Sequence, residues 1–454
     1  MHLSKALNVE KGDVITLVGA GGKTTAMYRL AQELAGAGWR VVTTTTTLIR
    51  PPTPAQSEHV ILNPDPAALL RQLQGALEKH HCVTVATGRI ADEKGKLRGL
   101  PPDLVARVAA LPGVDAVIVE GDGARGRSLK VPAPHEPVVP RATTILVPLA
   151  AADALGQPLS QETVHRPERV AALARIAPGD EITPQVVAAV LAHPQGGLKG
   201  APPGARVVPL LNKVEGGEAL APWNKDNSTG LAGAREAARL LLDTPAIERV
   251  LLAAVAGDDP VQEVWGRVAA VVLAAGASQR FGQPKQLLPW GEKTMLEHVV
   301  DVLLASPVHE VIVVLGAQAE AVGAALGERP VRIVVNERWD GGLSTSVRAG
   351  LGEVGPNAMA ALFVLADQPG LTPDLVERLV ERHRRTLGPI VAPVYKGRRG
   401  NPVLFDRALF PELAALQGDV GGRALIEKYP QRVERVEVES EAILLDVDTP
   451  EDYA

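Results

Sequence analysis

Short apolar runs alternate with amphipathic stretches along the whole chain, and this alternation limits the fold more than any other feature. The run DVITLVG at 13–19 has the length of a buried strand, and the stretch at 22–37 that follows it is expected to be helical. Parallel strands need a long crossover between them, and an intervening helix supplies it. The pattern therefore predicts an α/β protein whose parallel sheets are covered by helices.

The alternation restarts once, near the middle of the chain. The segment AGDDPVQEVWGRV at 256–268 interrupts it with glycine, proline and two acids, and a new series begins with VAAVVLAAG. A chain of 454 residues also exceeds one ordinary core, since domains commonly have about 100–200 residues. We expect two doubly wound domains, at 1–257 and 268–454, joined by a linker at 258–267.

Composition and charge exclude several classes of partner. Apolar residues make up 46% and charged residues 22% of the chain, as in globular proteins. The net charge of -5 offers no basic field to nucleic acid or to an anionic membrane, so neither is expected as a partner. The single cysteine, Cys82, fits a reducing compartment, and no apolar stretch approaches the roughly 20 residues of a membrane span. Residues 1–12 lack the apolar core of a signal peptide, so we expect a cytoplasmic protein.

The loop LAAGASQRFGQPK at 273–285 follows an apolar run and carries two cations, Arg280 and Lys285. It does not fit a dinucleotide fingerprint counted from Gly276, because Ser278 stands where that motif needs a glycine. It does not fit a Walker A loop either, because Phe281 and Gly282 stand where that motif needs Gly-Lys. Its Ala-Ala-Gly core is small enough for a ligand to lie against the backbone, whose N–H groups can form an anion-binding nest. Arg280 and Lys285 are suited to hold triphosphate oxygens, although a surface loop with two solvated charges would look the same.

Carboxylates end two predicted strands of the same half. Asp367 closes the apolar strand that runs into LADQP, and Asp446 and Asp448 close the strand predicted at 442–447. Parallel sheets place ligands at the carboxyl ends of their strands, where acids bind hard cations. These acids could together hold Mg²⁺ on a nucleotide. Alternatively each could cap a following helix, as the Thr-Pro-Glu-Asp sequence after Asp448 suggests.

Residues 268–454 closely resemble the molybdenum cofactor cytidylyltransferases, a family of MobA-like nucleotidyltransferases of the MocA type. The motifs that carry the resemblance, in the family's order, are LAAGASQRFGQPKQLL, GGLSTSVRAGL, LADQP, RRGNPVLF, GDVGGRALI and DVDTPEDY. The resemblance implies a Rossmann-like nucleotidyltransferase fold and transfer of CMP from CTP to the terminal phosphate of Mo-molybdopterin, with Mg²⁺ as cofactor and pyrophosphate as the leaving group. Since that acceptor is already an anion, the reaction needs positioning and charge neutralisation rather than a general base.

The same resemblance assigns roles to residues of these motifs. Arg280, Lys285 and Asp367 are the expected catalytic residues. Asp367 and Asp448 are expected to hold Mg²⁺, with Asp446 as the alternative second ligand. The nucleotide is expected to contact Leu273, Ala274, Ala275, Gly276, Ser344 and Ser346. Guanylyl-transferring relatives have Ala-Gly-Gly where this chain has Ala-Ala-Gly, which favours CTP; the alternative is GTP or another phosphorylated acceptor.

The segment VGAGGKTT at 18–25 follows a predicted strand and opens a predicted helix, which is the context of a phosphate-binding loop. Gly19 and Gly22 free the backbone of this loop. Lys23 can reach the β- and γ-phosphate oxygens, and Thr24 can reach Mg²⁺. Glu120 ends the apolar strand VIVE, where a carboxylate would bind the metal or orient an attacking group. These residues predict a P-loop-like domain that takes ATP or GTP.

Residues 8–255 resemble the YqeC-like accessory family of selenium-dependent molybdenum hydroxylases. The motifs GAGGKTT, VEGDGARGRSLKVPAPHEPV, HRPERV and LLNKV carry this resemblance. It implies a role in maturing a molybdenum hydroxylase, with the apo-enzyme as partner, but it names no reaction. The domain could be an NTPase or a nucleotide-gated module that delivers the cofactor without catalysis. Asn212 and Lys213 in LLNKV also hint at contact with a nucleobase.

Overall fold

The computed structural model describes residues 1–91, 95–214, 228–278, 281–445 and 453. It divides into two compact units, Met1–Trp265 and Gly266–Ala454, and each is described by itself. The strand β15 (Val261–Ala274) begins before this division and ends after it. The domain bounds expected from the sequence stay a prediction, and residues 261–267 of the expected linker are part of this strand.

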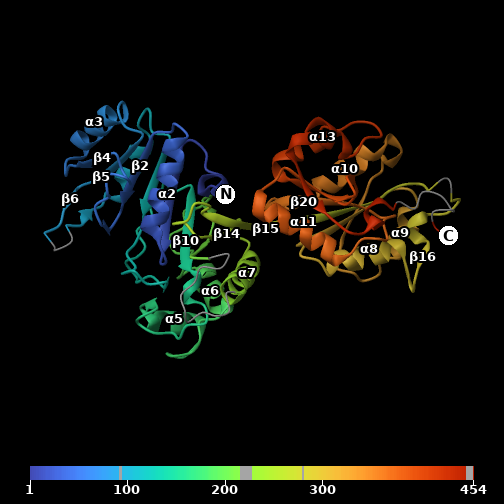
Figure 1. The fold of residues 1–454 in the computed structure, drawn as a ribbon, viewed down its shortest axis with the longest axis horizontal. Coiled ribbons are helices and arrows are strands. Elements are labelled where there is room, and N and C mark those ends of the chain that lie inside the picture. The colour runs from blue at the N-terminus through green and yellow to red at the C-terminus, as the bar shows by residue number, and fades with distance from the viewer. Residues whose placement is uncertain (92–94, 215–227, 279–280, 446–452, 454) are drawn as a thin grey trace. The chain divides into compact units, whose positions relative to one another are not determined.

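The first unit is built on one parallel sheet (Figure 1). Its strands lie in the order β4 (His59–Leu62), β5 (Cys82–Ala86), β2 (Val41–Thr45), β8 (Ala116–Glu120), β1 (Asp13–Gly19), β10 (Ile145–Ala151), β13 (Leu210–Asn212) and β14 (Arg249–Ala253). The α/β architecture predicted for this half is confirmed. Because Leu17 pairs with Glu120 and Gly19 pairs with Leu149, the loop after β1 begins beside the carboxyl ends of β8 and β10.

Short strands and helices complete the first unit. The short strands are β3 (Leu48–Ile49), β6 (Gly88–Arg89), β7 (Leu97–Arg98), β9 (Leu129–Lys130), β11 (Val164–His165) and β12 (Arg206–Val207). The helices are α1 (Leu3–Leu7), α2 (Lys23–Gly36), α3 (Pro66–Leu77), α4 (Pro102–Ala109), α5 (Pro167–Ala174), α6 (Pro184–Ala192) and α7 (Ser228–Leu242). Several of them begin with proline, which suits the first helical turn because its N–H has no partner inside the helix.

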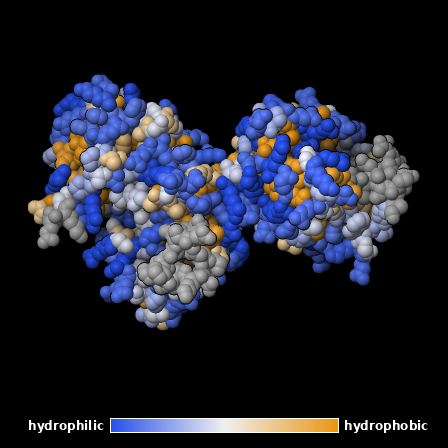
Figure 2. All heavy atoms as spheres, viewed as in Figure 1, coloured by the Kyte–Doolittle hydropathy of each residue, from blue (hydrophilic) through white to orange (hydrophobic). Residues whose placement is uncertain are grey.

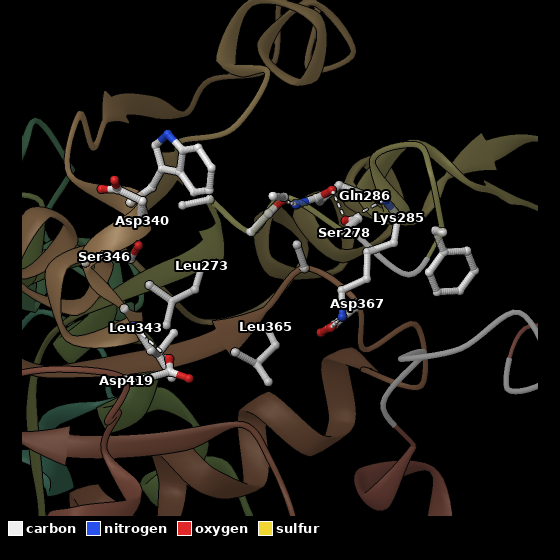
Figure 3. Close-up of a pocket in the computed structure, with 18 residues that line it drawn as sticks. Leu273, Ser278, Lys285, Gln286, Asp340, Leu343, Ser346, Leu365, Asp367 and Asp419 are labelled. Carbon is white, nitrogen blue, oxygen red and sulfur yellow. Dashed lines mark hydrogen bonds and ion pairs between the residues drawn. The ribbon is translucent and has the colours of Figure 1, made fainter.

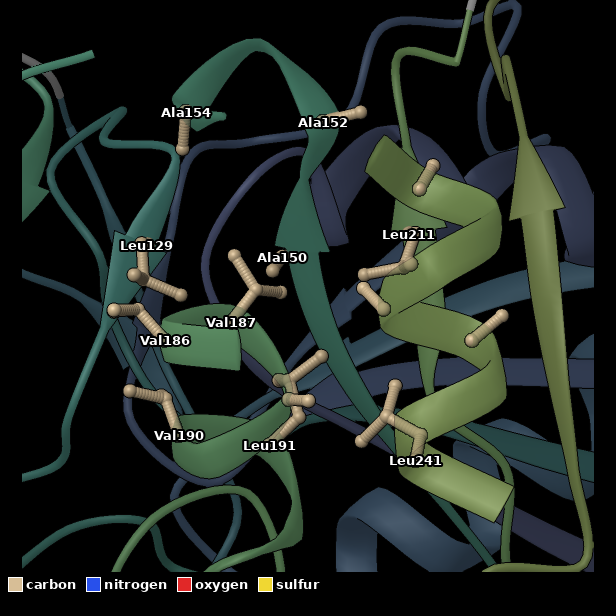
Figure 4. Packing of buried hydrophobic residues seen from close by; sticks show 14 of the residues in the cluster. Leu129, Ala150, Ala152, Ala154, Val186, Val187, Val190, Leu191, Leu211 and Leu241 are labelled. Atoms are coloured by element: carbon tan, nitrogen blue, oxygen red, sulfur yellow. The ribbon is translucent and has the colours of Figure 1, made fainter. Parts of the chain in front are cut away.

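The helices of the first unit bury apolar side chains against the sheet. Figure 4 shows Val187 and Leu191 of α6 and Leu241 of α7 packed beside Ala150 of β10 and Leu211 of β13. On another part of the sheet, α3 and α4 cover valines of β1, β2 and β8. Burial on both faces explains why these strands are continuous apolar runs rather than alternating ones.

The second unit contains a mixed sheet. Its strands lie in the order β19 (Arg332–Val335), β18 (Glu310–Leu315), β15, β20 (Ala358–Leu365), β23 (Val403–Asp406), β21 (Ile390–Tyr395) and β24 (Val433–Glu437). The first four are parallel, whereas β23 is antiparallel to both of its neighbours. The expectation of a purely parallel sheet is therefore wrong for this half. The short β22 (Arg398–Arg399) pairs back on β21, so the chain reaches β23 without a crossover helix.

Helices cover both faces of the second sheet. The helices are α8 (Met295–Leu304), α9 (Ala319–Ala324), α10 (Leu343–Gly352), α11 (Pro373–Thr386), α12 (Phe410–Ala414) and α13 (Arg423–Lys428), and a hairpin of β16 (Pro289–Trp290) and β17 (Lys293–Thr294) precedes α8. Alternate residues of β15 point to opposite faces: Val272 packs with α8 and α11, and Val271 lies on the face covered by α10.

One strand predicted at the end of the chain is not observed. Residues Glu441–Leu444 form a 3₁₀ turn instead of the start of a strand at 442–447, and Ser440 Oγ accepts a hydrogen bond from the Ala442 N–H at 3.2 Å. The place beside β21 is taken by β24, whose Val433 pairs with Ile390. The last residues of the expected strand, including Asp446, lie outside the described part of the chain.

The helices of the described residues include no candidate for a membrane-spanning segment. None of their helices combines the length and the hydropathy that a membrane crossing would require. In both units the face shown in Figure 2 is mostly hydrophilic, and apolar side chains gather in small areas between the polar ones.

Candidate active site

A cavity of about 870 Å³ opens at the carboxyl edge of the second sheet. Leu273 at the end of β15 pairs with Leu365 at the end of β20, so the loops after these strands leave the same edge of the sheet. A third wall comes from the start of α10, where Leu343 and Ser346 line the cavity (Figure 3). This is the position at which parallel sheets place their ligands.

Lys285 and Asp367 meet across this cavity. Lys285 begins the 3₁₀ turn Lys285–Leu287, Asp367 follows β20, and their side chains form an ion pair (Figure 3). The pair uses Oδ2 of Asp367, whereas its buried Oδ1 has no hydrogen-bond partner among the described residues. An unpartnered carboxylate oxygen is a hard ligand of the kind that Mg²⁺ prefers, so Asp367 fits the metal role predicted for it.

Two residues that sequence reasoning did not assign hold the glycine loop in shape. The Gln286 Nε2 donates hydrogen bonds to the carbonyl oxygens of Ala274 and Gly276, both at 3.0 Å. Ser278, with a φ of 50°, accepts a hydrogen bond on its Oγ from the Lys285 N–H at 2.9 Å. These bonds close the two ends of the loop on each other. Both residues lie inside the quoted motif, but no local pattern shows which carbonyl an amide will reach.

The start of α10 is fixed by contacts with distant residues. Gly342 has a φ of 93°, and a Cβ there would lie 2.6 Å from the backbone of Gly418. The Leu343 N–H donates to Asp419 Oδ1 at 3.1 Å, so this carboxylate occupies part of the helix N-terminus that we expected to face a nucleotide. The Asn336 Nδ2 donates to the hydroxyls of Thr345 and Ser346 at 2.8 and 3.1 Å.

The structure brings most of the predicted residues of this half together. Those that line the cavity are Leu273, Ala275, Gly276, Lys285, Ser346 and Asp367. Ala274 is buried and contributes its carbonyl to Gln286, and Ser344 is fully buried with its hydroxyl lacking a partner among the described residues. Arg280, Asp446 and Asp448 lie outside the described residues. All these roles stay predictions.

The residues that line the cavity without having been predicted include a tryptophan and two acids. Trp339 and Asp340 lie in the 3₁₀ turn that precedes α10, and Asp419 comes from the loop before α13. Gly341 and Gly342 follow Asp340, and Gly418 precedes Asp419. These glycines could have indicated the site from the sequence, because glycine is used where backbone segments approach closely.

The glycine loop of the first unit is closely packed. Gly19, Gly21 and Gly22 have φ values of 91°, 91° and 118°, which residues with a side chain rarely adopt. The Lys23 Nζ donates to the carbonyl oxygen of Gly19 at 2.5 Å and lies 3.3 Å from Asp122 Oδ1. The predicted loop residues are thus together at the end of β1, and Asp122 joins them.

Glu120 lies beside this loop. Burial raises the pKa of its carboxyl group, against the opposing effects of the Lys23 charge and of the hydrogen bond that Thr24 Oγ1 donates at 2.7 Å. Among the described residues, no three His, Cys, Asp or Glu side chains are grouped as a metal centre. An ion at Glu120 or Asp367 would also take oxygen ligands from a substrate or water, as Mg²⁺ on nucleotides does.

The hint of a nucleobase contact at Asn212 is not supported by its environment. Its Nδ2 donates to the Gly21 carbonyl at 2.7 Å and its Oδ1 accepts from the Val255 N–H at 3.0 Å. Lys213 pairs with Asp153 at 2.6 Å. Asn212 therefore ties the glycine loop to the strands β13 and β14 rather than facing a ligand.

These features define an α/β protein with a candidate site at the carboxyl edge of each of two sheets, one formed by a glycine-lysine loop and one by a loop with an acid–lysine pair. Residues 270–434 match the MobA-like NTP transferase domain, and residues 15–168 match the YqeC protein family. The chain belongs to both families: a YqeC domain is followed by a MobA-like NTP transferase domain.

Similar proteins cover the two units separately. Nicotine blue oxidoreductase of Paenarthrobacter nicotinovorans is 38% identical over 193 residues, which is 40% of this chain and 93% of that protein. The uncharacterized protein YqeC of Escherichia coli K12 is 32% identical over 204 residues, or 44% of this chain and 75% of that protein. Molybdenum cofactor cytidylyltransferase of the same bacterium is 27% identical over 187 residues, or 40% of this chain and 92% of that protein.

Proposed function

We propose that the second unit transfers CMP from CTP to the terminal phosphate of Mo-molybdopterin, forming molybdopterin cytosine dinucleotide and pyrophosphate. The observation that carries the proposal is the Lys285–Asp367 pair, which stands in the cavity beside the small Ala275 and Gly276. Among the described residues, a triphosphate against this loop would meet the Lys285 cation and a carboxylate oxygen of Asp367 that has no hydrogen-bond partner. No side chain is required as a general base, because the acceptor phosphate is an anion at neutral pH.

Each side chain of the pair has a separate task in this reaction. Lys285 would exchange its bond to Asp367 for phosphate oxygens and stabilise the charge that develops on the leaving pyrophosphate. Asp367 would hold Mg²⁺, which when bound neutralises charge on the triphosphate. The bonds of Gln286 and Ser278 keep the loop in one conformation, so positioning requires little rearrangement at the moment of reaction.

The names of the relatives support a cofactor-related nucleotidyltransferase but leave the acceptor open. Molybdenum cofactor cytidylyltransferase supports CMP transfer, at 27% identity. Nicotine blue oxidoreductase is more similar, at 38% identity, and this specific observation favours a second candidate in which the second unit is an oxidoreductase. The first candidate is preferred because hydride transfer does not explain an unpartnered carboxylate oxygen next to a lysine. GTP, or another phosphorylated acceptor, is a further variant of the first.

The N-terminal unit suggests which enzyme would use the product of this reaction. Its YqeC relationship, together with its fusion to an NTP transferase domain, supports a role in maturing a molybdenum hydroxylase, including a selenium-dependent one. Under this proposal the partners are Mo-molybdopterin and the hydroxylase apo-enzyme, the cofactor is Mg²⁺, and the work is done in the cytoplasm.

The experiment is a pyrophosphate-release assay with the full chain, Mg²⁺ and Mo-molybdopterin, comparing CTP, GTP and ATP. CTP should give the fastest release, and Asp367→Ala and Lys285→Ala should each lower the rate about 100-fold or more. Lys293→Ala is the matched control, because this lysine is half exposed and pairs with Asp301 on the surface of the same unit.

Other outcomes decide between the candidates. Pyrophosphate release with GTP but not with CTP would show that GTP is the nucleotide substrate. Pyrophosphate release with a different phosphorylated acceptor would show that molybdopterin is not the acceptor. No pyrophosphate with any pair, together with oxidation of NADH or NADPH by the chain, would favour the second candidate and overturn the first.

A further inference from the structure

The first unit contains four charged side chains that are almost completely buried near the end of β1. Lys23, Glu120, Asp122 and Lys130 are 4%, 6%, 1% and 3% exposed. Charged groups are rarely buried unless they are paired or bind a ligand, because desolvation is costly. We term these residues the buried charge cluster. They take no part in the reaction proposed for the second unit, so their presence needs another explanation.

Asp122 lies at the centre of this cluster. Its Oδ1 accepts a hydrogen bond from the Gly19 N–H at 3.1 Å and lies 3.3 Å from Lys23 Nζ. Its Oδ2 lies 2.7 Å from Lys130 Nζ. A backbone N–H with two ammonium groups is a donor set suited to phosphate oxygens. The carboxylate of Asp122 therefore stands where this loop could bind a phosphate.

The neighbouring pair of Thr24 and Glu120 offers oxygen ligands instead of cations. Thr24 lies in the first turn of α2 and donates a hydrogen bond from Oγ1 to Glu120 Oε2 at 2.7 Å. Hydroxyl and carboxylate oxygens suit Mg²⁺, which commonly completes its shell with phosphates and water. Because Thr24 directly follows Lys23, groups for phosphate and groups for a metal ion are adjacent.

Close packing around its glycines fixes the backbone conformation of the loop. A Cβ at Gly22 would lie 2.4 Å from the Asn212 Nδ2, and one at Gly21 would lie 2.5 Å from the Ala151 N atom. The hydrogen bond from the Asn212 Nδ2 to the Gly21 carbonyl also fixes this conformation. The backbone of the loop is therefore pre-organised, and admitting a phosphate requires the Asp122 side chain to move.

Lys130 would keep an ion-pair partner if Asp122 were displaced. Lys130 also lies 2.8 Å from Glu136 Oε2, and Arg166 lies 2.7 Å from the same oxygen. A phosphate entering the cluster would thus take over Lys23 and the Gly19 N–H while Lys130 kept a carboxylate partner. Exchange of one anion for another avoids leaving a buried ammonium group unpaired.

We propose that the first unit is a second nucleotide site, which binds the phosphates of a nucleoside triphosphate together with a divalent cation, and that Asp122 is the anion that fills the loop when no nucleotide is bound. Binding replaces the Asp122 contacts of Lys23 by phosphate contacts, and Thr24 and Glu120 face the metal ion. The proposal does not specify the nucleobase, because the amide of Asn212 already forms hydrogen bonds with the backbone of Gly21 and Val255.

The test is equilibrium binding of AMPPNP and GMPPNP, with and without Mg²⁺, to the full chain carrying Lys285→Ala and Asp367→Ala, which removes the charged pair of the other site. We expect saturable, Mg²⁺-dependent binding that Lys23→Met weakens about 100-fold. Lys11→Ala is the matched control, because this lysine is 64% exposed in the same unit, and it should leave the affinity unchanged.

Further variants test the metal ligand and the internal anion. Glu120→Gln should remove most of the Mg²⁺ dependence, because an amide is a poorer ligand for a hard cation. Asp122→Asn should tighten nucleotide binding about tenfold, because the competing and repelling charge is gone. Weaker binding by Asp122→Asn would show that Asp122 contacts the ligand complex instead, and would overturn its role as a stand-in anion.

Unaltered affinity of the Lys23→Met chain, or no binding of either analogue, would overturn the site itself. Thr24→Val is the second variant, to be used if thermal unfolding shows that Lys23→Met does not fold, and it should weaken Mg²⁺-dependent binding about tenfold. Pyrophosphate release from CTP is measured on the unmodified chain. Its absence would sink the function proposed for the second unit while leaving this nucleotide site standing.

Discussion

At the scale of single residues, both candidate sites depend on polar side chains that are bonded on more than one side. Gln286 bridges the carbonyl oxygens of Ala274 and Gly276, and Asn212 bridges Gly21 and Val255. Buried amides with both ends satisfied rigidify what they touch, and losing one leaves buried partners without a hydrogen bond. Sequence motifs marked the residues that face a ligand, but not these supports.

Glu136 provides a pH-dependent prediction at the residue scale. Burial by itself raises the pKa of its carboxyl group, but hydrogen bonds from Arg166 and Lys130 outweigh burial and lower the pKa from 4.5 to about 2. A carboxyl group whose pKa is lower in the folded state stabilises the fold above its unfolded pKa, and this contribution disappears as the pH falls from about 4.5 to about 2.

We therefore expect Glu136→Gln to lower the free energy of unfolding by about 2 kcal/mol at pH 7 and by progressively less below pH 4.5. Urea unfolding of both chains across this pH range measures the difference. Glu78→Gln, at an exposed position after α3, is the control. A difference that does not shrink with falling pH would mean that the loss comes from packing rather than charge.

At the scale of elements, the start of α10 shows how a helix can be placed by contacts outside itself. Its first residue follows Gly342, whose positive φ and closeness to Gly418 leave no room for a side chain. The helix itself spans Leu343–Gly352. The N-terminal contact with Asp419 was not predictable, because it joins loops that are distant in the chain.

Gly342→Ala should accordingly destabilise the second unit by about 1–3 kcal/mol and raise the KM for CTP, since both the φ and the space are unsuitable for a Cβ. Gly352→Ala, at the other end of the same helix, meets nothing within 4 Å and should be neutral or slightly stabilising. Urea unfolding and pyrophosphate release measure the two effects. Equal stability of the two variants would contradict the packing seen at Gly342.

At the scale of the whole molecule, the chain contains two units with two separate candidate sites. Each site lies at the carboxyl edge of its own sheet, beside a glycine loop that follows a central strand, β1 in one and β15 in the other. A ligand stabilises the unit that it binds by mass action and leaves the rest of the chain less affected.

Hydrogen exchange should therefore distinguish the two sites in one experiment. Mg²⁺ with CTP is expected to slow backbone exchange at 273–278 and 341–346, whereas Mg²⁺ with the nucleotide of the first unit should slow exchange at 18–24. Mass spectrometry of the resolved peptides measures this. Protection of 18–24 that depends on Lys285 and Asp367 would contradict the assignment of two independent sites.

Local patterns in the sequence determined much of this protein. Apolar runs and helical spacing located most of the parallel strands and helices, and the loop motifs placed Lys23, Lys285 and Asp367 at strand ends, because these features depend only on neighbouring residues. The same patterns misread residues 442–444 as the start of a strand, and they did not show that β23 runs antiparallel to its neighbours. Neither a β partner nor the direction of a returning strand is encoded by periodicity alone.

Tertiary structure decided which charges meet and which groups remain without partners. Asp122 lies between Lys23 and Lys130, and Asp367 reaches Lys285, only because the strand order brings separate loops to one edge of a sheet. Whether a carboxylate is an ion-pair partner, a helix cap or a ligand for a metal depends on what stands within about 3 Å of it. That environment is formed by residues far apart in the chain, so only the folded structure defines it.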